Sequence, residues 1–565
     1  MQLSEQEVVR REKLAKLREI GINPYPADLF PIDSNSKEIK SDFAENKKVV
    51  IAGRLMSRRI QGKASFAELQ DGEGRIQVYF NRDEICTSED KTLYNDVYKK
   101  LLDIGDFIGI EGTLFTTKVG EKTVMVNDFK LLSKALKPLP LPKVDAEGNT
   151  YDAFNDPEMR YRQRYADLVV NPNVKEVFIK RTKLFNAMRS FFNDAGYFEV
   201  ETPVLQPIPG GAAARPFITH HNSLDIPLYM RIANELYLKR LIVGGFDGVY
   251  EFSKNFRNEG MDRTHNPEFT AMEIYVSYKD YNWMMDFCEQ LLEHCAIAVN
   301  GTSKATFGEH EIDFKAPYAR VAMADAIKHF TGFDITDKTE DEIREAAKGM
   351  NIEVDETMGK GKLIDEIFGE KCEGNYIQPT FITDYPKEMS PLCKEHRDNP
   401  ELTERFELMV CGKEIANAYS ELNDPIDQRE RFEYQLKLAA KGDDEATEFI
   451  DHDFLRALEY GMPPTSGMGI GMDRLIMFLT NNQSIQEVLF FPQMRPEKKA
   501  PSVALNDEEK AVLSIITKAE KIELVALKTQ SGLSNKKWDK TIKGLTKKEV
   551  AKVSKTDEVL FVEVL

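Results

Sequence analysis

The sequence lacks closely spaced cysteines. Its six cysteines are scattered along the chain, and no two of them form a Cys-x-x-Cys pair. This spacing argues against a zinc site and favours buried thiols in a reducing compartment. The chain also has no apolar run long enough to span a bilayer, and its charged N-terminus has no apolar signal segment. We therefore expect a cytoplasmic protein.

The sequence also lacks an excess of positively charged residues. The formal net charge is -18 at pH 7, which argues against a protein that simply coats nucleic acid. It leaves room for a nucleic-acid partner bound through local basic patches. Of the 565 residues, 30% are charged and 42% are hydrophobic. This composition is typical of a soluble globular protein, and the length predicts three or four domains.

Residues 249–275 form two stretches of alternating apolar and polar residues, joined by a polar loop at residues 260–267. This pattern predicts a β-hairpin. Taken singly, charged residues on a strand usually lie on a solvated face. Here a cation, carboxylates and aromatic rings are expected on one face, with His265 and Asn266 beside it, which favours a functional site. The residues of this face are Arg257, Glu259, Phe269, Glu273 and Tyr275.

Three motifs make the sequence recognisable. FRNE followed by HNPEF, at residues 256–259 and 265–269, resembles motif 2 of class II aminoacyl-tRNA synthetases. GMGIGMDR at residues 467–474 resembles motif 3, and GYFEVETPVL at residues 196–205 resembles motif 1. The surrounding sequence is most similar to the bacterial-type class II lysyl-tRNA synthetases. The resemblance covers about residues 1–497 and leaves a C-terminal extension.

The resemblance implies a homodimeric enzyme that attaches L-lysine to tRNA(Lys) through a lysyl-adenylate, with Mg²⁺ bound together with ATP. The sequence shows no nucleophile–base pair, and none is required, because phosphoryl transfer depends on positioning and charge stabilisation. Arg257 and Arg474 are the expected catalytic residues. The implied ATP-binding residues are Arg257, Asn258, Glu259, His265, Asn266, Phe269, Glu414, Gly469, Gly471 and Arg474.

A lysine pocket must bind two ammonium groups and one carboxylate. The resemblance implies that Glu235 binds the α-amine and Glu421 the ε-amine. Without the resemblance, the sequence would predict that Glu235 is an ordinary helix-surface residue. Tyr419 stands where the family more usually has Phe. The implied lysine-binding residues are Gly211, Glu235, Glu273, Tyr275, Asn417, Tyr419 and Glu421.

The resemblance also implies a metal pair, Glu414 and Glu421. These residues lie seven positions apart, so strict strand alternation would place them on opposite faces. If both bind one metal cluster, a β-bulge must intervene or Glu414 must lie in the turn.

Residues 49–135 contain five short alternating runs separated by Gly and Asp-Gly turns. They predict an OB-fold barrel, a common module for single-stranded nucleic acid. Spacing alone assigns Phe66 to the barrel core. The resemblance instead implies that the barrel reads the anticodon, with Phe66 stacking on a base. The expected anticodon-binding residues are Arg58, Arg59, Phe66 and Gln77.

The remaining segments complete an α+β multidomain architecture. We expect an N-terminal helical arm at residues 1–48, whose basic helix either is solvated or contacts RNA. A linker at 136–160 leads to a class II antiparallel-sheet catalytic domain at 161–497, with a helical insertion at about 319–374. The resemblance places the helix at residues 172–195 in the homodimer interface.

Residues 502–565 follow a segment marked by Pro492, Pro496 and Pro501. Their pattern predicts three helices and a hairpin, a winged-helix-like appendage. The third helix is rich in lysine, and either it is solvated or it binds nucleic acid.

Other protein classes fit less well. An aspartyl- or asparaginyl-tRNA synthetase would need cations where this chain has carboxylates. A ligase that attaches lysine to a protein would lack the barrel. A catalytically dead RNA-binding regulator would be expected to lose Arg257, Arg474 or the glutamate pair, and all are present.

Overall fold

The computed structural model describes residues 3–144, 150–151, 154–212, 214–440, 449–496, 505–519, 521–548, 550–556 and 559–564. It divides into two compact units, Met1–Gln493 and Met494–Leu565. Pro501, expected between them, lies outside the described residues. No helix in the described ranges is both long and apolar enough to cross a membrane.

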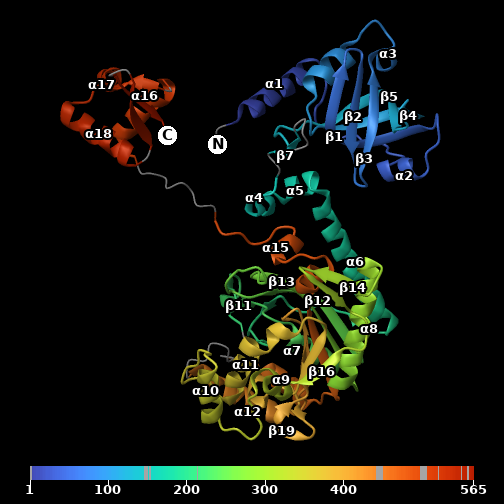
Figure 1. The fold of residues 1–565 in the computed structure, drawn as a ribbon, viewed down its shortest axis with the longest axis vertical. Coiled ribbons are helices and arrows are strands. Elements are labelled where there is room, and N and C mark those ends of the chain that lie inside the picture. The colour runs from blue at the N-terminus through green and yellow to red at the C-terminus, as the bar shows by residue number, and fades with distance from the viewer. Residues whose placement is uncertain are drawn as a thin grey trace. The chain divides into compact units, whose positions relative to one another are not determined.

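Five strands near the N-terminus close into a barrel in the order β1-β2-β3-β5-β4 (Figure 1). Buried and outward-facing residues alternate along β2 and β3, so the apolar half of each strand fills the barrel. The predicted OB-fold is therefore present. Its strands are β1 (Lys48–Gln61), β2 (Ala64–Gln70), β3 (Arg75–Asn81), β4 (Phe107–Thr116) and β5 (Lys122–Ser133), with helices α3 (Arg82–Ile85) and η1 (Leu93–Leu101) between β3 and β4.

The N-terminal arm contains α1 (Glu5–Glu19) and α2 (Ser36–Ser41). Part of the basic face of α1 attaches the arm to the barrel domain. Arg10 is buried and donates hydrogen bonds to the carbonyls of Ile104 and Ala135, and the Lys13 ammonium lies 2.6 Å from Asp103. These two cations therefore have structural partners.

The catalytic domain is built on an eight-stranded sheet in the order β16-β17-β20-β21-β22-β13-β12-β8. All pairs are antiparallel except the two at its edges, β16 with β17 and β12 with β8. The predicted antiparallel catalytic sheet is thus present. Its strands are β8 (Phe198–Glu199), β12 (Gly248–Phe256), β13 (Glu268–Ser277), β16 (Ala319–Ala322), β17 (Thr380–Thr383), β20 (Arg405–Val410), β21 (Lys413–Ser420) and β22 (Thr465–Gly471).

Each face of the sheet packs against different helices. One face forms the largest apolar core with α6 (Pro172–Asp194), α8 (Tyr281–Asn300) and α14 (Met472–Leu479). The other face, through Val249 and Tyr275, packs against α7 (Glu235–Val243), α12 (Pro425–Ala440) and α13 (His452–Glu459). The helix predicted over 172–195 is α6, and Gly196 follows it with φ +82°.

Shorter elements connect these layers. The helices are α4 (Pro157–Arg162), α5 (Arg164–Val170) and α15 (Ile485–Val488), and the short strands include β9 (Leu205–Gln206), β10 (Ile218–His221), β11 (Ile226–Met230), β14 (Lys304–Phe307), β15 (His310–Asp313), β18 (Glu395–His396) and β19 (Asn399–Thr403).

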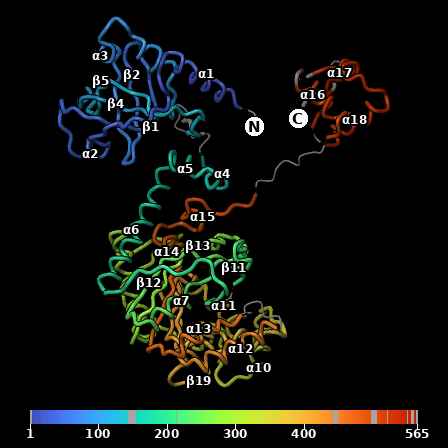
Figure 2. Tube along the Cα trace, turned by 180° about the vertical axis from the view of Figure 1, so that it is seen from behind, coloured from blue at the N-terminus to red at the C-terminus, as the bar shows by residue number. Residues whose placement is uncertain are grey.

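The segment expected to be a helical insertion begins with a strand instead. Residues 319–322 form β16, which pairs with β17 and so belongs to the catalytic sheet. The helical part comprises α9 (Met323–Thr331), α10 (Glu340–Gly349) and α11 (Lys360–Lys371), which share an apolar core. Figures 1 and 2 both show α10, α12 and β19 gathered at one end of the catalytic domain.

The C-terminal unit contains α16 (Asp507–Ala519), β23 (Lys521–Glu523), α17 (Leu524–Ser531), α18 (Asn535–Lys547), β24 (Ala551–Thr556) and β25 (Val559–Val564). The three helices and the hairpin were expected. Strand β23 was not, and it pairs with β25 in the order β23-β25-β24. The unit has its own apolar core around Ile516, Trp538 and Leu545. Its winged-helix-like character stays a prediction.

Candidate active site

The hairpin expected at residues 249–275 is formed by β12 and β13. Its first strand ends at Phe256, so Arg257 and Glu259 lie just beyond the strand rather than on it. The Arg257 amide still donates to the Pro267 carbonyl at 2.9 Å, which keeps Arg257 at the mouth of the hairpin. The polar loop thus extends from the end of the largely buried hairpin of β12 and β13.

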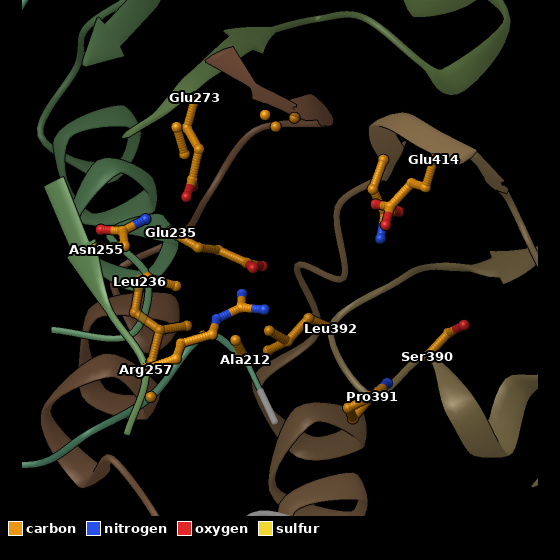
Figure 3. A pocket seen from close by; sticks show the side chains of 18 of the residues that line it. Ala212, Glu235, Leu236, Asn255, Arg257, Glu273, Ser390, Pro391, Leu392 and Glu414 are labelled. Carbon is orange, nitrogen blue, oxygen red and sulfur yellow. The ribbon is translucent and has the colours of Figure 1, made fainter. Parts of the chain in front are cut away.

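A cavity of about 620 Å³ is lined in part by residues of this hairpin. Figure 3 shows the guanidinium of Arg257 and the carboxylates of Glu235, Glu273 and Glu414 pointing toward its interior from different elements. Of the expected substrate-binding residues, Asn258 and Glu421 are absent from the lining. The expected residues that line it are Gly211, Glu235, Arg257, Glu259, His265, Asn266, Phe269, Glu273, Tyr275, Glu414, Asn417, Tyr419, Gly469, Gly471 and Arg474.

Arg257 is held over an aromatic ring and keeps hydrogen-bonding capacity. Its guanidinium carbon lies 5.1 Å from the ring centroid of Phe269, a distance suited to a cation–π contact. Its Nε is buried and has no hydrogen-bond partner among the described residues. A buried donor of this kind is costly unless a ligand accepts from it, so the position favours an anion.

The remaining loop residues lie around the mouth of the cavity. His265 Nδ1 lies 2.8 Å from Asp262, and Asn266 Nδ2 donates to the Glu268 carbonyl at 2.6 Å. Glu259 accepts from the Arg215 amide at 3.3 Å, while the Asn258 amide donates to the Arg215 carbonyl at 2.7 Å. The backbone of Asn258 thus joins the loop to Arg215, and its role in ATP binding stays a prediction.

Two donors contact Glu235, which is the first residue of α7. Its Oε1 accepts from the Tyr419 hydroxyl at 2.6 Å and from the Lys239 ammonium at 2.5 Å. The same ammonium contacts Glu421. Burial by itself lowers the pKa of Lys239, but the two carboxylates outweigh this effect and raise it above 10.5. Lys239 is therefore a charged group buried between two carboxylates.

Sequence reasoning missed Lys239. The available signal was its position four residues after Glu235, which places the two side chains on one face of a helix. In a helix whose other residues are apolar apart from Arg240, that pairing predicts a buried ion pair.

Glu273 lies on β13 and accepts from the Tyr275 hydroxyl at 3.0 Å. Burial, and then the nearby negative charge of Glu235, raise the pKa of Glu273 to about 8. Near neutral pH this carboxyl group is mostly protonated until a cation enters the cavity.

Glu421 lies beneath the cavity floor rather than in its wall. Its side chain is fully buried, and burial raises its pKa well above 4.5 although Lys239 opposes this. Its Oε1 lacks a hydrogen-bond partner among the described residues. Gly467 leaves the space for it, because a Cβ there would come within 2.2 Å of this oxygen.

The expected β-bulge near Glu414 is present. Leu408 pairs with Ala416 but Met409 pairs with Glu414, so Ile415 is the extra residue. The bulge places Glu414 among the cavity-lining residues together with Asn417 and Tyr419. The metal pair Glu414–Glu421 stays a prediction.

A different carboxylate lies close to Glu414. Burial, and then the negative charge of Glu414, raise the pKa of Glu407 to about 7. Glu407 also accepts from Arg405 at 2.6 Å. The sequence does not single out Glu407, because only the bulged pairing of β20 with β21 brings it near Glu414.

The glycine-rich strand β22 runs between the two halves of the site. Gly469 pairs with Glu273 on one side and with Asn417 on the other. Arg474 lies in the first turn of α14 and contacts the carbonyl of Glu414, with its Nη1 3.7 Å from the Glu414 carboxylate. The strand therefore brings motif 2, motif 3 and β21 to one cavity.

On the barrel, Phe66 faces outward rather than into the core. Its neighbours Ser65 and Ala67 are buried, and its ring lies 4.8 Å from that of Tyr79. Gln77 is on the same outer surface, where it donates to Thr123 at 2.8 Å. Tyr79 extends the aromatic surface and was not predicted.

The two arginines expected near the anticodon differ. Arg58 donates to the Tyr98 carbonyl at 2.5 Å and lies over the Tyr98 ring, so its guanidinium already has partners in the protein. Arg59 is exposed and pairs in register with Phe66. Arg59 is thus the better placed of the two for a phosphate.

Comparison with known proteins agrees with this geometry. The family of class II tRNA synthetases (D, K and N) matches residues 156–495, and the OB-fold nucleic acid binding domain matches residues 49–132. The chain belongs to the class II tRNA synthetases.

The similar curated proteins are more specific. A protein of Christiangramia forsetii named Lysine--tRNA ligase is 79% identical over 559 residues, which cover 99% of this chain and 98% of that protein. One of Porphyromonas gingivalis with the same name is 69% identical over 506 residues, 89% and 87% of the two chains. One of Azobacteroides pseudotrichonymphae, also named Lysine--tRNA ligase, is 65% identical over 499 residues, 88% of this chain and 99% of that protein.

Proposed function

We propose that this chain is a lysine–tRNA ligase that uses ATP to attach L-lysine to tRNA(Lys) through lysyl-adenylate. The observation that carries this proposal is the charge in the cavity. Glu235, Glu273 and Glu421 supply three carboxylates against one internal ammonium, Lys239. When all are ionised, two negative charges remain for the two ammonium groups of lysine.

Lysine then lies with its ammonium groups toward these glutamates and its carboxylate toward Arg257. The free Nε of Arg257 supports this orientation, because a planar guanidinium binds a carboxylate and a phosphate together. A lysine carboxylate oxygen attacks the α-phosphorus of ATP, and pyrophosphate leaves. The terminal ribose hydroxyl of tRNA next attacks the lysyl carbonyl, and AMP leaves. Neither step needs a protein nucleophile.

Phe269 and Arg474 are proposed to enclose the adenine, with Glu259 accepting from its exocyclic amine. Both Phe269 and Arg474 line the cavity. His265 and Asn266, at the mouth, reach the outer phosphates. The open backbone of Gly469 and Gly471 permits close approach of the nucleotide, since side chains there would narrow the cavity.

We assign the magnesium carboxylates to Glu407 and Glu414. Two neighbouring carboxylates whose charges repel fit a hard divalent cation, and the raised pKa of Glu407 reports that repulsion after burial. Mg²⁺ bound with ATP would neutralise charge on the phosphates. In the expected pair of Glu414 and Glu421, the second residue already contacts the ammonium group of Lys239.

A homodimer is proposed through the motif 1 region. Phe198, Val204 and Leu205 are large apolar side chains that are exposed in the single chain. A patch of this kind near α6 favours a second copy of the chain. The described cysteines form no disulfide, in keeping with the cytoplasmic location that we propose.

Pyrophosphate exchange with ATP, measured with each of the twenty amino acids, tests the assignment. Lysine alone is expected to support exchange, and the enzyme is then expected to transfer lysine from lysyl-adenylate to tRNA(Lys). Exchange driven by aspartate or asparagine would instead assign the chain to the neighbouring members of its family. Absence of exchange with every amino acid would favour an RNA-binding regulator.

A further inference from the structure

Helix α18 of the C-terminal unit carries lysines on one narrow strip. Lys536, Lys540, Lys543 and Lys547 are spaced by four, three and four residues, and all four are exposed. At 3.6 residues per turn they fall within about one sixth of the helix circumference. Over the described part of the unit, none of the four makes an ion pair. We refer to these four residues as the lysine strip.

The packing of α18 fixes where the strip points. Trp538 and Leu545 lie on the opposite side of the helix and are buried in the core of the unit. Gly544 lets α16 approach closely, since a Cβ there would come within 2.2 Å of the Glu509 carboxylate. The helix therefore cannot rotate to hide the strip without losing its apolar contacts.

Two other lysines of this segment are used inside the unit. Lys537 lies 2.8 Å from Glu508, and Lys548 lies 2.6 Å from the buried Glu509. These ion pairs join α18 to α16. The segment thus separates into lysines that make ion pairs with α16 and lysines for which the described residues show no ion pair.

We infer that the lysine strip binds the phosphate backbone of tRNA while the catalytic domain acts on that tRNA. A solvated helix face usually mixes both signs of charge at spacings of three or four residues. In α18 the only acidic residue is Asp539, at the edge of the strip. Four like charges over about 16 Å repel one another and are stabilised by a polyanion.

The charge of the whole chain makes the strip distinctive. The formal net charge is -18, yet the twelve lysines of residues 502–565 outnumber the ten acidic residues there. A polyanionic substrate is repelled by the chain as a whole and attracted by this segment. The enzyme's own tRNA is such a substrate, so no additional partner is required.

The strip adds affinity and takes no part in the chemistry. The Azobacteroides relative has 99% of its length covered by 88% of this chain, so it has no counterpart for about a tenth of it. The class II family match ends at residue 495, before the C-terminal helices begin. Lysine activation is therefore expected to proceed without the strip.

The test compares two variants of the full-length chain. The first is K540Q/K543Q/K547Q in the strip. The second is the matched control K510Q/K528Q/K552Q, which removes the same charge from α16, α17 and β24. Glutamine has nearly the helix propensity of lysine, so α18 is retained. For each variant, the dissociation constant for tRNA(Lys) is measured over a range of KCl concentrations, together with pyrophosphate exchange.

Each phosphate contact contributes about 0.7–0.9 to the slope of log affinity against log salt. The strip variant is expected to lower this slope by about two to three relative to both wild type and the control, and to leave exchange unchanged. Equal slopes for the strip and control variants would overturn the inference. It would also be overturned if an acidic polypeptide displaced tRNA(Lys) from the wild-type chain as effectively as unlabelled tRNA does. If the wild-type chain showed no lysine-dependent exchange, the proposed function would be refuted instead. The choice of tRNA as the ligand rests on that function.

Discussion

The phenolic hydroxyl of Tyr419 donates a 2.6 Å hydrogen bond to Oε1 of Glu235. The resemblance to lysyl-tRNA synthetases implies phenylalanine as the more usual residue at this position, and a phenylalanine could not make this bond. It links β21 to the first residue of α7, two elements far apart in the chain. Because Lys239 contacts the same oxygen, the carboxylate of Glu235 is held from two sides.

Replacing Tyr419 with phenylalanine removes this hydroxyl alone. A hydrogen bond to a charged acceptor contributes about 1.5–3 kcal/mol, which corresponds to a rise in the KM for lysine of roughly tenfold or more. Lys239 still holds Glu235, so kcat and the KM for ATP are expected to stay near wild type. The measurement is pyrophosphate exchange with lysine and ATP varied in turn. An equal change in both KM values would contradict a role confined to the lysine pocket.

Replacing Glu421 with glutamine has a larger expected effect. It removes one of the two carboxylates around the buried Lys239 and one of the charges that balance the substrate. Leaving a buried charge underpaired costs about 3–5 kcal/mol. Lysine-dependent exchange is expected to fall at least a hundredfold, while ATP still binds.

The control for Glu421→Gln is E259Q, which changes a carboxylate at the nucleotide end of the cavity. It is expected to raise the KM for ATP more than that for lysine. Thermal unfolding of both variants separates a pocket defect from a folding defect. Exchange within about threefold of wild type in E421Q would exclude Glu421 from the lysine site.

The binding of lysine is expected to strengthen as pH rises from about 6 to 8. The pKa of Glu273 is raised to about 8, chiefly by burial, with Glu235 and Tyr275 beside it. An incoming ammonium group favours the charged form, so binding must first remove the proton. The dissociation constant for lysine, measured by calorimetry across this range, should lose much of its pH dependence in E273Q. An identical pH profile in E273Q would assign the proton to another group.

The same residue predicts how the stability of the free enzyme depends on pH. Because the folded-state pKa of Glu273 lies above its ordinary value of 4.5, the folded state binds the proton more tightly than the unfolded state. Its contribution to the free energy of unfolding is complete below about pH 4.5 and is lost as pH rises through about 8. Saturating lysine should offset this loss, which thermal melts at pH 6 and pH 8 can measure.

Replacing Phe66 with alanine is expected to weaken tRNA charging without affecting adenylate formation. The ring faces outward on the barrel beside Tyr79, and stacking on a base contributes about 1–3 kcal/mol. The control is F80A, because Phe80 is fully buried in the barrel and stacks on Tyr98 at 4.0 Å. The control should destabilise the barrel, whereas F66A should not. A matching loss of pyrophosphate exchange in F66A would point to a folding defect.

Local patterns in the sequence were enough to predict much of the architecture. Apolar residues at every second position predicted the strands of the barrel and the hairpin that leads to Arg257. Apolar residues at helical spacing predicted the helices of the C-terminal unit. In both cases the period of the element determines which face is buried. Motif 2 and motif 3 identified part of the cavity lining, namely Arg257, Glu259, His265, Asn266, Phe269, Gly469, Gly471 and Arg474. These features depend on neighbours within one element or on short motifs that retain their spacing.

Other features depend on contacts between distant segments. Lys239 is a site residue only because the fold brings Glu421, which directly follows β21, into contact with a lysine of α7. Glu407 joins Glu414 only through a bulge whose position depends on pairing between two strands. Phe66 faces outward because the register of β2 against its neighbours assigns Ser65 and Ala67 to the interior.

The sequence by itself therefore determined the family, the order of the domains and the principal residues of the cavity. The tertiary structure decided which carboxylates share a cation, which lysines of α18 are already paired and which remain exposed. The physical reason is that electrostatic interactions fall off with distance and with solvent exposure. Neither quantity is known for a side chain until the segments that surround it have been placed.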